Sequence, residues 1–177
     1  MNLSFSTRGW GDLSWDELLD SALDMKFTGI EVYNLFKFPA LTGRGGPFHK
    51  HTIAATLRHL RDLKLTIPCL DTSLDLSDCI ADTDIVEQML HIAHDLQVPY
   101  VVAWASHGDE DGEQMLHSSI AQLLPIAEQL GVCLLIKTSG IYADTARLRK
   151  TLESYASDWL GALWDMHHPY RDFGESA

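Results

Sequence analysis

The fold is decided by residues 98–136, which contain two apolar runs: VPYVVAW at residues 98–104 and VCLLI at residues 132–136. Between these two apolar runs, about Gly112 to Leu130 has the spacing of a helix, and Gly131 follows as a typical helix terminator. The two runs are apolar nearly throughout, as expected of strands that are covered on both faces. A strand–helix–strand unit of this kind favours parallel strands with a right-handed crossover.

The same strand–helix period extends over the whole sequence. We predict further strands at Leu3–Phe5, Gly29–Tyr33, Leu65–Leu70 and Leu160–Trp164, and further helices after the capping box Ser14–Glu17 and at about His51–Leu63, Asp84–Leu96 and Asp144–Tyr155. This pattern gives six parallel strands with one helix after each of the first five, so the fold class is α/β.

Two architectures fit this order, an open doubly wound sheet and part of an eight-stranded TIM barrel. No glycine-rich dinucleotide fingerprint opens the first helix, and polar residues follow many strands rather than one switch point, so the barrel is favoured. We therefore predict a single partial (β/α) barrel domain over residues 1–177, forming the N-terminal portion of a longer barrel. Open edges on the first and sixth strands are expected to favour a homodimer.

Composition narrows the classes of partner. The chain has 13 Lys and Arg against 25 Asp and Glu, and this formal charge of −12 argues against a nucleic-acid partner, because phosphate binding requires clustered cations. The sequence shows neither a signal peptide nor an apolar run of the roughly 20 residues that cross a membrane. The odd set Cys69, Cys79 and Cys133 forms no CxxC pair and indicates a reducing compartment. We therefore expect a cytoplasmic protein without a membrane partner.

Polar and aromatic side chains collect where the predicted strands end, and in a barrel these ends converge on one mouth. The strand-end residues are Ser6, Thr7, Arg8, Trp10, Glu31, Tyr33, Asn34, Asp71, Thr72, Trp104, Ser106, His107, Lys137, Thr138, Tyr142, Asp165, His167, His168 and Arg171. A carboxylate followed three residues later by a histidine, as in Asp165 and His168, is suited to hold a divalent metal and a sugar hydroxyl.

The candidates for substrate binding are His168, Arg171, Glu31, Trp104 and His107. Core packing explains Trp104 equally well, and an ion pair explains Glu31 equally well.

Three segments resemble, in order, the sugar phosphate isomerase/epimerase family, which is the xylose isomerase-like group of TIM barrels. They read GIEVY (29–33), LLIKTSG (134–140) and WDMHHPYR (164–171). The resemblance implies an isomerase of carbohydrate metabolism that acts on a small sugar or polyol. It also implies one Mn²⁺ or Mg²⁺, held by a Glu, an Asp, a His and a Glu from strands 5 to 8. Asp165 matches the strand-6 metal ligand, and His168 matches a residue that contacts a substrate hydroxyl.

Lys137 stands where the resemblance places the strand-5 carboxylate. Its ammonium could pair with Asp165 and Glu31 and inactivate the site, form a Schiff base with a carbonyl substrate, or point to solvent. Strands 7 and 8 are absent from the pattern, and one carboxylate cannot hold Mn²⁺ in an oxygen-rich site. The first hypothesis is therefore a sugar isomerase or epimerase that is metal-dependent in intact family members and inactive as this chain.

Two other functions stay open. The first is a non-catalytic domain that binds a sugar-like ligand or a partner. The second is an endonuclease IV-like nuclease, which the acidic composition and the small number of His and carboxylate ligands argue against. Glu87, His91 and His94 share one face of a predicted helix, and the glycine-rich segment 42–47 could cradle a phosphate. A solvated helix face and a flexible surface loop explain these two features better.

Overall fold

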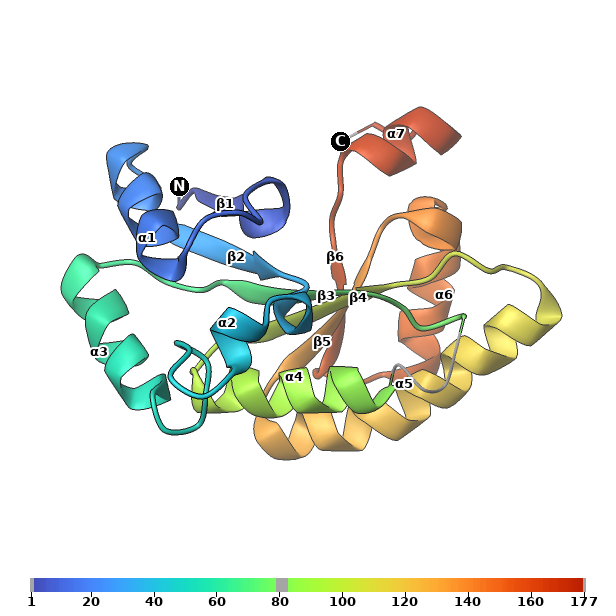
Figure 1. Ribbon diagram of the computed structural model, residues 1–177. Coiled ribbons are helices and arrows are strands. Elements are labelled where there is room, and N and C mark those ends of the chain that lie inside the picture. The colour runs from blue at the N-terminus through green and yellow to red at the C-terminus, as the bar shows by residue number, and fades with distance from the viewer. Residues whose placement is uncertain (1, 79–82, 177) are drawn as a thin grey trace.

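The computed structural model describes residues 2–78 and 83–176, which contain one six-stranded parallel sheet with its strands paired in chain order (Figure 1). The strands are β1 (Ser4–Ser6), β2 (Gly29–Tyr33), β3 (Cys69–Asp75), β4 (Tyr100–Trp104), β5 (Cys133–Lys137) and β6 (Leu160–Leu163). Because each strand pairs with the next one in sequence, the strand order never reverses as it does in a doubly wound sheet. The partial barrel is therefore the correct one of the two predicted architectures.

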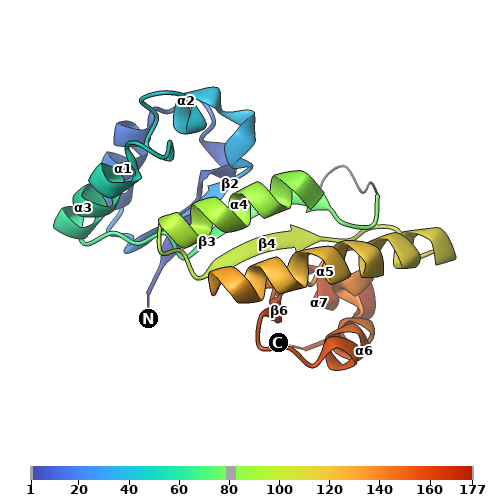
Figure 2. The same cartoon turned by 90° about the horizontal axis from the view of Figure 1, so that it is seen from below.

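One main helix follows each of the first five strands. These helices are α1 (Trp15–Asp24), α3 (Ile53–Leu63), α4 (Thr83–Asp95), α5 (Glu110–Leu130) and α6 (Thr145–Tyr155). Shorter helical segments are η1 (Thr7–Gly9), η2 (Leu35–Lys37), α2 (Pro39–Thr42), η4 (Gly140–Ala143) and α7 (His167–Phe173). Figure 2 shows α4 and α5 side by side over β3 and β4, so the helices cover the outer face of the sheet.

The strand side chains alternate between this helix-covered face and the opposite, concave face. Val32, Leu70 and Leu134 are fully buried and form the core with helix residues such as Leu90 and Ile120. Strand residues on the opposite, inner face include the polar side chains of Glu31, Asp71 and Lys137. Apolar packing therefore fixes the outer face of the sheet and leaves the inner face available for a polar site.

Strand β3 lies later in the sequence than the predicted strand Leu65–Leu70. Pro68 has no N–H to donate to a neighbouring strand, and Thr66 forms only an isolated bridge with Gly29. The polar segment that follows pairs with β4, with Asp71 opposite Val102 and Asp75 opposite Trp104. The apolar run predicted only the first part of this strand, because its later residues are polar. Asp71 therefore lies within the strand and not after it.

A short helix follows β6 where the strand–helix pattern predicted none: α7 covers His167–Phe173. Pro169 lies in the first turn of α7, where its missing N–H costs no helical hydrogen bond. Gly174 ends the helix in the left-handed conformation at φ 66°. His167 therefore begins a helix and does not alternate with His168 along a strand.

The predicted N-terminal cap of α1 is confirmed. Ser14 and Glu17 form the predicted capping box, with the Ser14 N–H donating to Glu17 Oε2 at 2.8 Å. Cys69 and Cys133 are free thiols, and Cys79 lies outside the described residues. Within the described ranges, no helix is both long and apolar enough to cross a membrane.

Candidate functional site

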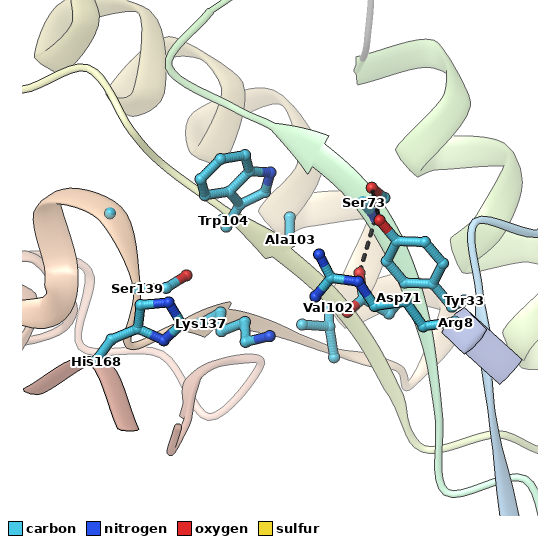
Figure 3. Close-up of a pocket in the computed structure, with 11 residues that line it drawn as sticks. Arg8, Tyr33, Asp71, Ser73, Val102, Ala103, Trp104, Lys137, Ser139 and His168 are labelled. Carbon is cyan, nitrogen blue, oxygen red and sulfur yellow. Dashed lines mark hydrogen bonds between the residues drawn. The ribbon is translucent and has the colours of Figure 1, made fainter. Parts of the chain in front are cut away.

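A polar cavity of about 160 Å³ lies at the carboxyl ends of the strands (Figure 3). Its lining comes from η1, from β2 to β5 and from the segments after β5 and β6, and consists of Arg8, Tyr33, Asp71, Ser73, Val102, Ala103, Trp104, Lys137, Ser139, Gly140 and His168. The cavity is smaller than the 300–1,000 Å³ of drug-sized ligand sites. Its size and its hydroxyl, carboxyl and cationic groups suit a small polar ligand.

Lys137, Asp165 and His168 form an ion-pair cluster at one wall of this cavity. The Lys137 Nζ is 3.5 Å from Asp165 Oδ2, and the His168 Nδ1 is 3.0 Å from the same oxygen. The His168 Nδ1 is buried and has no hydrogen-bond partner among the described residues. The side chains of Lys137 and Asp165 are only 22% and 19% exposed, so water screens their charges only in part.

The surroundings of Asp165 favour its ionised form. Burial alone would raise the pKa of its carboxyl group, but the N–H of His167 donates to Oδ1 at 3.0 Å, and His168 and Lys137 lie close by. Together these interactions lower the pKa of Asp165 below its ordinary value. Asp165 is therefore an anion that the protein neutralises with its own side chains.

The backbone around this cluster is fixed by Thr138 and Gly140. The buried Thr138 hydroxyl accepts a hydrogen bond from the Asp165 N–H at 2.7 Å, which ties the end of β6 to the end of β5. Gly140 has φ +60°, and a Cβ at this position would clash with the carbonyl oxygen of Ala105. A glycine is therefore required for the chain after β5 to approach the end of β4 this closely.

The opposite wall is built from Arg8, Tyr33, Asp71 and Ser73, as Figure 3 shows. The Tyr33 and Ser73 hydroxyls are hydrogen-bonded at 2.5 Å, and the guanidinium carbon of Arg8 lies 5.2 Å from the centre of the Tyr33 ring. The Ser73 N–H donates to Asp71 Oδ1 at 2.8 Å. Figure 3 places the indole of Trp104 between this wall and the Lys137 side.

Asp71 is the carboxylate whose ionised form is disfavoured. Burial raises its pKa above the ordinary value, and the nearby Glu31 carboxylate acts in the same direction. The hydrogen bond from Ser73 and the charges of Lys137 and Arg8 oppose this shift without cancelling it. Asp71 lines the cavity and Asp165 contacts Lys137 and His168 at its wall, and the surroundings of these two carboxylates shift their pKa values in opposite directions.

The structure brings together four of the predicted site residues. Lys137, Trp104 and His168 line the cavity, and Asp165 contacts two of them. The pairing of Lys137 with Asp165 agrees with the first of the three interpretations of this lysine. Lys137 directly follows the predicted fifth strand, and Asp165 and His168 follow the predicted sixth strand.

Three predicted site residues, Glu31, His107 and Arg171, neither line this cavity nor belong to the Lys137 cluster. Glu31 lies beside the thiol of Cys69, whose Sγ is 3.6 Å from Glu31 Oε2. His107 is exposed, with its Nε2 3.8 Å from Asp78. Arg171 is exposed on α7, and its guanidinium donates to both carboxylate oxygens of the adjacent Asp172, at 2.6 and 3.0 Å. It therefore bonds a neighbour on its own helix.

Ser73 and Ser139 belong to the cavity and were absent from the predicted strand ends. Regular alternation along β3 gives no signal for Ser73, because this residue has a positive φ of 59° at an irregularity of the strand. The helix face of Glu87, His91 and His94 holds no metal cluster, and the His94 Nδ1 lies 2.7 Å from the Leu130 carbonyl oxygen. In the part of the chain that the structure describes, no group of three or more His, Cys, Asp or Glu residues could hold a metal ion.

The sequential parallel sheet, its outer helices and a polar site at the strand ends define the class of TIM-barrel-like proteins. The family model of the xylose isomerase-like TIM barrel matches residues 19–176, and the chain belongs to this family. The fold class and the family resemblance predicted from the sequence are thereby confirmed. No curated protein sequence matches the chain.

Solved structures of several sugar epimerases share the fold. A 3-keto-D-glucoside 4-epimerase from E. coli gives a TM-score of 0.79 at 12% identity, covering 99% of this chain and 72% of that protein. An L-ribulose 3-epimerase gives 0.75 at 18% identity, with coverage of 99% and 64%. A D-psicose 3-epimerase, crystallised in the presence of D-fructose, gives 0.73 at 13% identity, with coverage of 99% and 67%. The chain thus spans about two thirds of the length of these proteins.

The described residues do not fit the divalent metal that the family resemblance implies. Asp165 and His168 provide two donors on one side of the cavity, and the next group in the cluster is the ammonium of Lys137. An ammonium cannot donate electrons to a metal, and its charge repels a dication. Two donors beside a cation do not make the oxygen-rich coordination sphere that Mn²⁺ or Mg²⁺ prefers.

Proposed function

We propose that this chain binds a small sugar or polyol in the strand-end cavity and that, as this chain, it does not carry out metal-dependent isomerisation. The observation that supports the proposal is the cavity lining itself. Hydroxyl, carboxyl and cationic groups surround a space of about 160 Å³, and the Trp104 indole adds an aromatic ring to the lining. A sugar offers the complementary surface, because its hydroxyls both donate and accept hydrogen bonds and its C–H groups pack on an aromatic ring.

The absence of turnover follows from the Lys137 cluster. Proton transfer beside a sugar carbonyl requires a group that polarises the carbonyl and stabilises the enediolate, and a metal ion provides this most directly. In the described part of the chain, the Asp165 carboxylate is neutralised by Lys137 and has only His168 as a second donor. We therefore propose that the site recognises the sugar without converting it.

Isomerisation or epimerisation of a sugar is the second candidate function. One observation favours it: Asp165 and His168 lie side by side with their nitrogen and oxygen 3.0 Å apart, and His168 lines the cavity. Ligands from a longer chain or from a partner would be needed to complete a metal site around this pair.

Sugar binding is tested by titration calorimetry of the 177-residue chain with D-fructose, D-psicose and myo-inositol. We expect saturable one-site binding to at least one of them, weakened fivefold or more by Trp104→Ala. Tyr100→Ala is the matched control, because Tyr100 is an aromatic residue at the other end of β4 and is 42% exposed. This control is expected to bind as the wild type does.

Turnover is tested by incubating the chain with D-fructose and Mn²⁺ and separating the ketoses by chromatography. No D-psicose is expected. Formation of D-psicose would favour the isomerase function over simple binding. In the binding test, equal effects of Trp104→Ala and Tyr100→Ala would contradict the assignment of the cavity as the sugar site.

A further inference from the structure

One carboxylate oxygen beside the cavity is approached by two nitrogen groups. Asp165 Oδ2 lies 3.5 Å from Lys137 Nζ and 3.0 Å from His168 Nδ1. A divalent cation bound by this carboxylate would have to share the space beside Oδ2 with the lysine ammonium. The two cations therefore compete for the same oxygen.

The ammonium is also directed toward the ligand space. Lys137 lines the cavity, and Figure 3 shows its side chain extending from β5 toward the Arg8 and Asp71 wall. An ammonium has three N–H donors, and its pairing with Asp165 leaves others for a ligand oxygen. Held by Asp165, it presents a fixed positive charge to the cavity.

We propose that Lys137 is a built-in cation that takes the place of a divalent metal in this site, pairing with Asp165 beside His168 and donating to a ligand oxygen. The site is then closed to Mn²⁺ and needs none to bind its ligand. The ligand part of this inference rests on the proposed sugar binding, whereas the exclusion of metal stands without it.

Charge reversal at this position makes the inference testable. A glutamate at position 137 would face Asp165 across the space that the ammonium fills, with His168 as a third donor. Two carboxylates and an imidazole provide a donor set that suits Mn²⁺. Like charges on the two carboxylates would also favour cation uptake.

The experiment is Mn²⁺ titration calorimetry, with thermal unfolding with and without Mn²⁺, on the wild-type 177-residue chain and on Lys137→Glu. We expect no measurable binding to the wild type, at least tenfold tighter binding to Lys137→Glu, and a rise in melting temperature with Mn²⁺ for the variant only. Lys150→Glu is the matched control, because it makes the same change in net charge at an exposed position of α6. The double variant Lys137→Glu/Asp165→Asn is expected to lose the gained binding.

A neutral variant covers the case in which Lys137→Glu does not fold. Lys137→Gln removes the ammonium without adding a charge, and we expect it to bind Mn²⁺ more weakly than the glutamate variant and more tightly than the wild type. Wild-type Mn²⁺ binding as tight as that of the variants would overturn the proposal. Folded variants that bind no Mn²⁺ would also overturn it, because the donor groups of the cluster would then not converge on one cation site.

The ligand part has its own readout. D-fructose affinity of the wild type is expected to be unchanged by EDTA and to fall fivefold or more in Lys137→Gln. An EDTA-sensitive affinity, or an unchanged affinity in Lys137→Gln, would contradict the role of Lys137 toward the ligand. Absence of binding by D-fructose, D-psicose and myo-inositol would refute the proposed sugar binding and the ligand part together, and would leave the metal measurements to decide the rest.

Discussion

At the scale of single residues, the carboxylates of Asp71 and Asp165 make opposite contributions to stability. The pKa of Asp71 is raised in the folded chain, chiefly by burial. Between its ordinary and its raised pKa, the folded chain holds a proton that the unfolded chain has lost. Stability therefore falls as the pH rises through this window, and the loss persists at neutral pH.

Replacing Asp71 by asparagine is expected to stabilise the chain at pH 7, because the amide is uncharged and its oxygen can still accept from the Ser73 N–H. The gain should vanish as the pH approaches the ordinary pKa of an aspartate. Thermal unfolding of wild type and variant from pH 3 to pH 7 measures the difference. A constant difference over this range would show that the charge of Asp71 is not its cause.

Asp165→Asn is expected to change the stability of the chain in the opposite direction to Asp71→Asn. The pKa of Asp165 is lowered in the folded chain, so its ionised form contributes stability above the ordinary aspartate pKa. That contribution is lost as the pH falls through the lowered pKa. The variant is expected to be less stable than the wild type at pH 7 and to approach it at low pH.

The sequence indicates site residues where a side chain of suitable chemistry follows the end of a clearly apolar strand. Lys137, Asp165 and His168 follow the ends of apolar strands that the sequence marks clearly, and all three meet in the structure. Arg171 and His107 were predicted from the same rule, yet α7 and the loop after β4 direct them to neighbouring carboxylates. The end of a predicted strand indicates a backbone position, whereas the turn or helix that follows decides where the side chain points.

At the scale of single elements, helix α6 ends in a strained residue. Ala156 caps α6 in the left-handed conformation, with φ 46° and ψ 45°. This conformation costs an L-residue about 1–2 kcal/mol and costs glycine little. Gly131 ends α5 in the same conformation, at φ 66° and ψ 33°, where glycine is already present.

Ala156→Gly is therefore expected to stabilise the chain by up to about 1 kcal/mol, after the greater entropy of an unfolded glycine is subtracted. Gly131→Ala should destabilise it by about the same amount, since an added Cβ would be 3.9 Å from Trp159 and meets no steric clash. Urea unfolding of both variants measures the two changes. Changes of the same sign would contradict the conformational cause.

The elements that the sequence missed share one property. Helix packing makes the outer face of each strand apolar, so periodicity finds β2, β4, β5 and the main helices within a few residues. The later part of β3 is polar because it faces the cavity, and α7 begins with two histidines and a proline. Both segments contain polar residues that line the cavity, namely Asp71 and Ser73 in β3 and His168 in α7. Their composition therefore favours loops over a strand or a helix.

At the scale of the whole molecule, β6 ends the sheet of the described residues, and its free edge is accompanied by exposed apolar side chains. Trp164, Met166, Tyr170 and Phe173 are 49–68% exposed on the segment that follows β6 and on α7. An unpaired edge beside an apolar patch is a template for association. We therefore expect the 177-residue chain to self-associate through this edge at micromolar concentration.

Proline substitution along β6 can separate association from folding. The Trp159 and Leu163 carbonyls accept from β5, so the odd-numbered residues of β6 face β5 and Ala162 directs its N–H to the free edge. Ala162→Pro is expected to yield a monomer by multi-angle light scattering with nearly unchanged melting temperature, because no hydrogen bond to β5 is lost. Gly161→Pro places the same ring one residue earlier, against β5, and should cost about 3 kcal/mol or more. A monomeric wild type, or a dimer that persists in Ala162→Pro, would show that this edge does not mediate association.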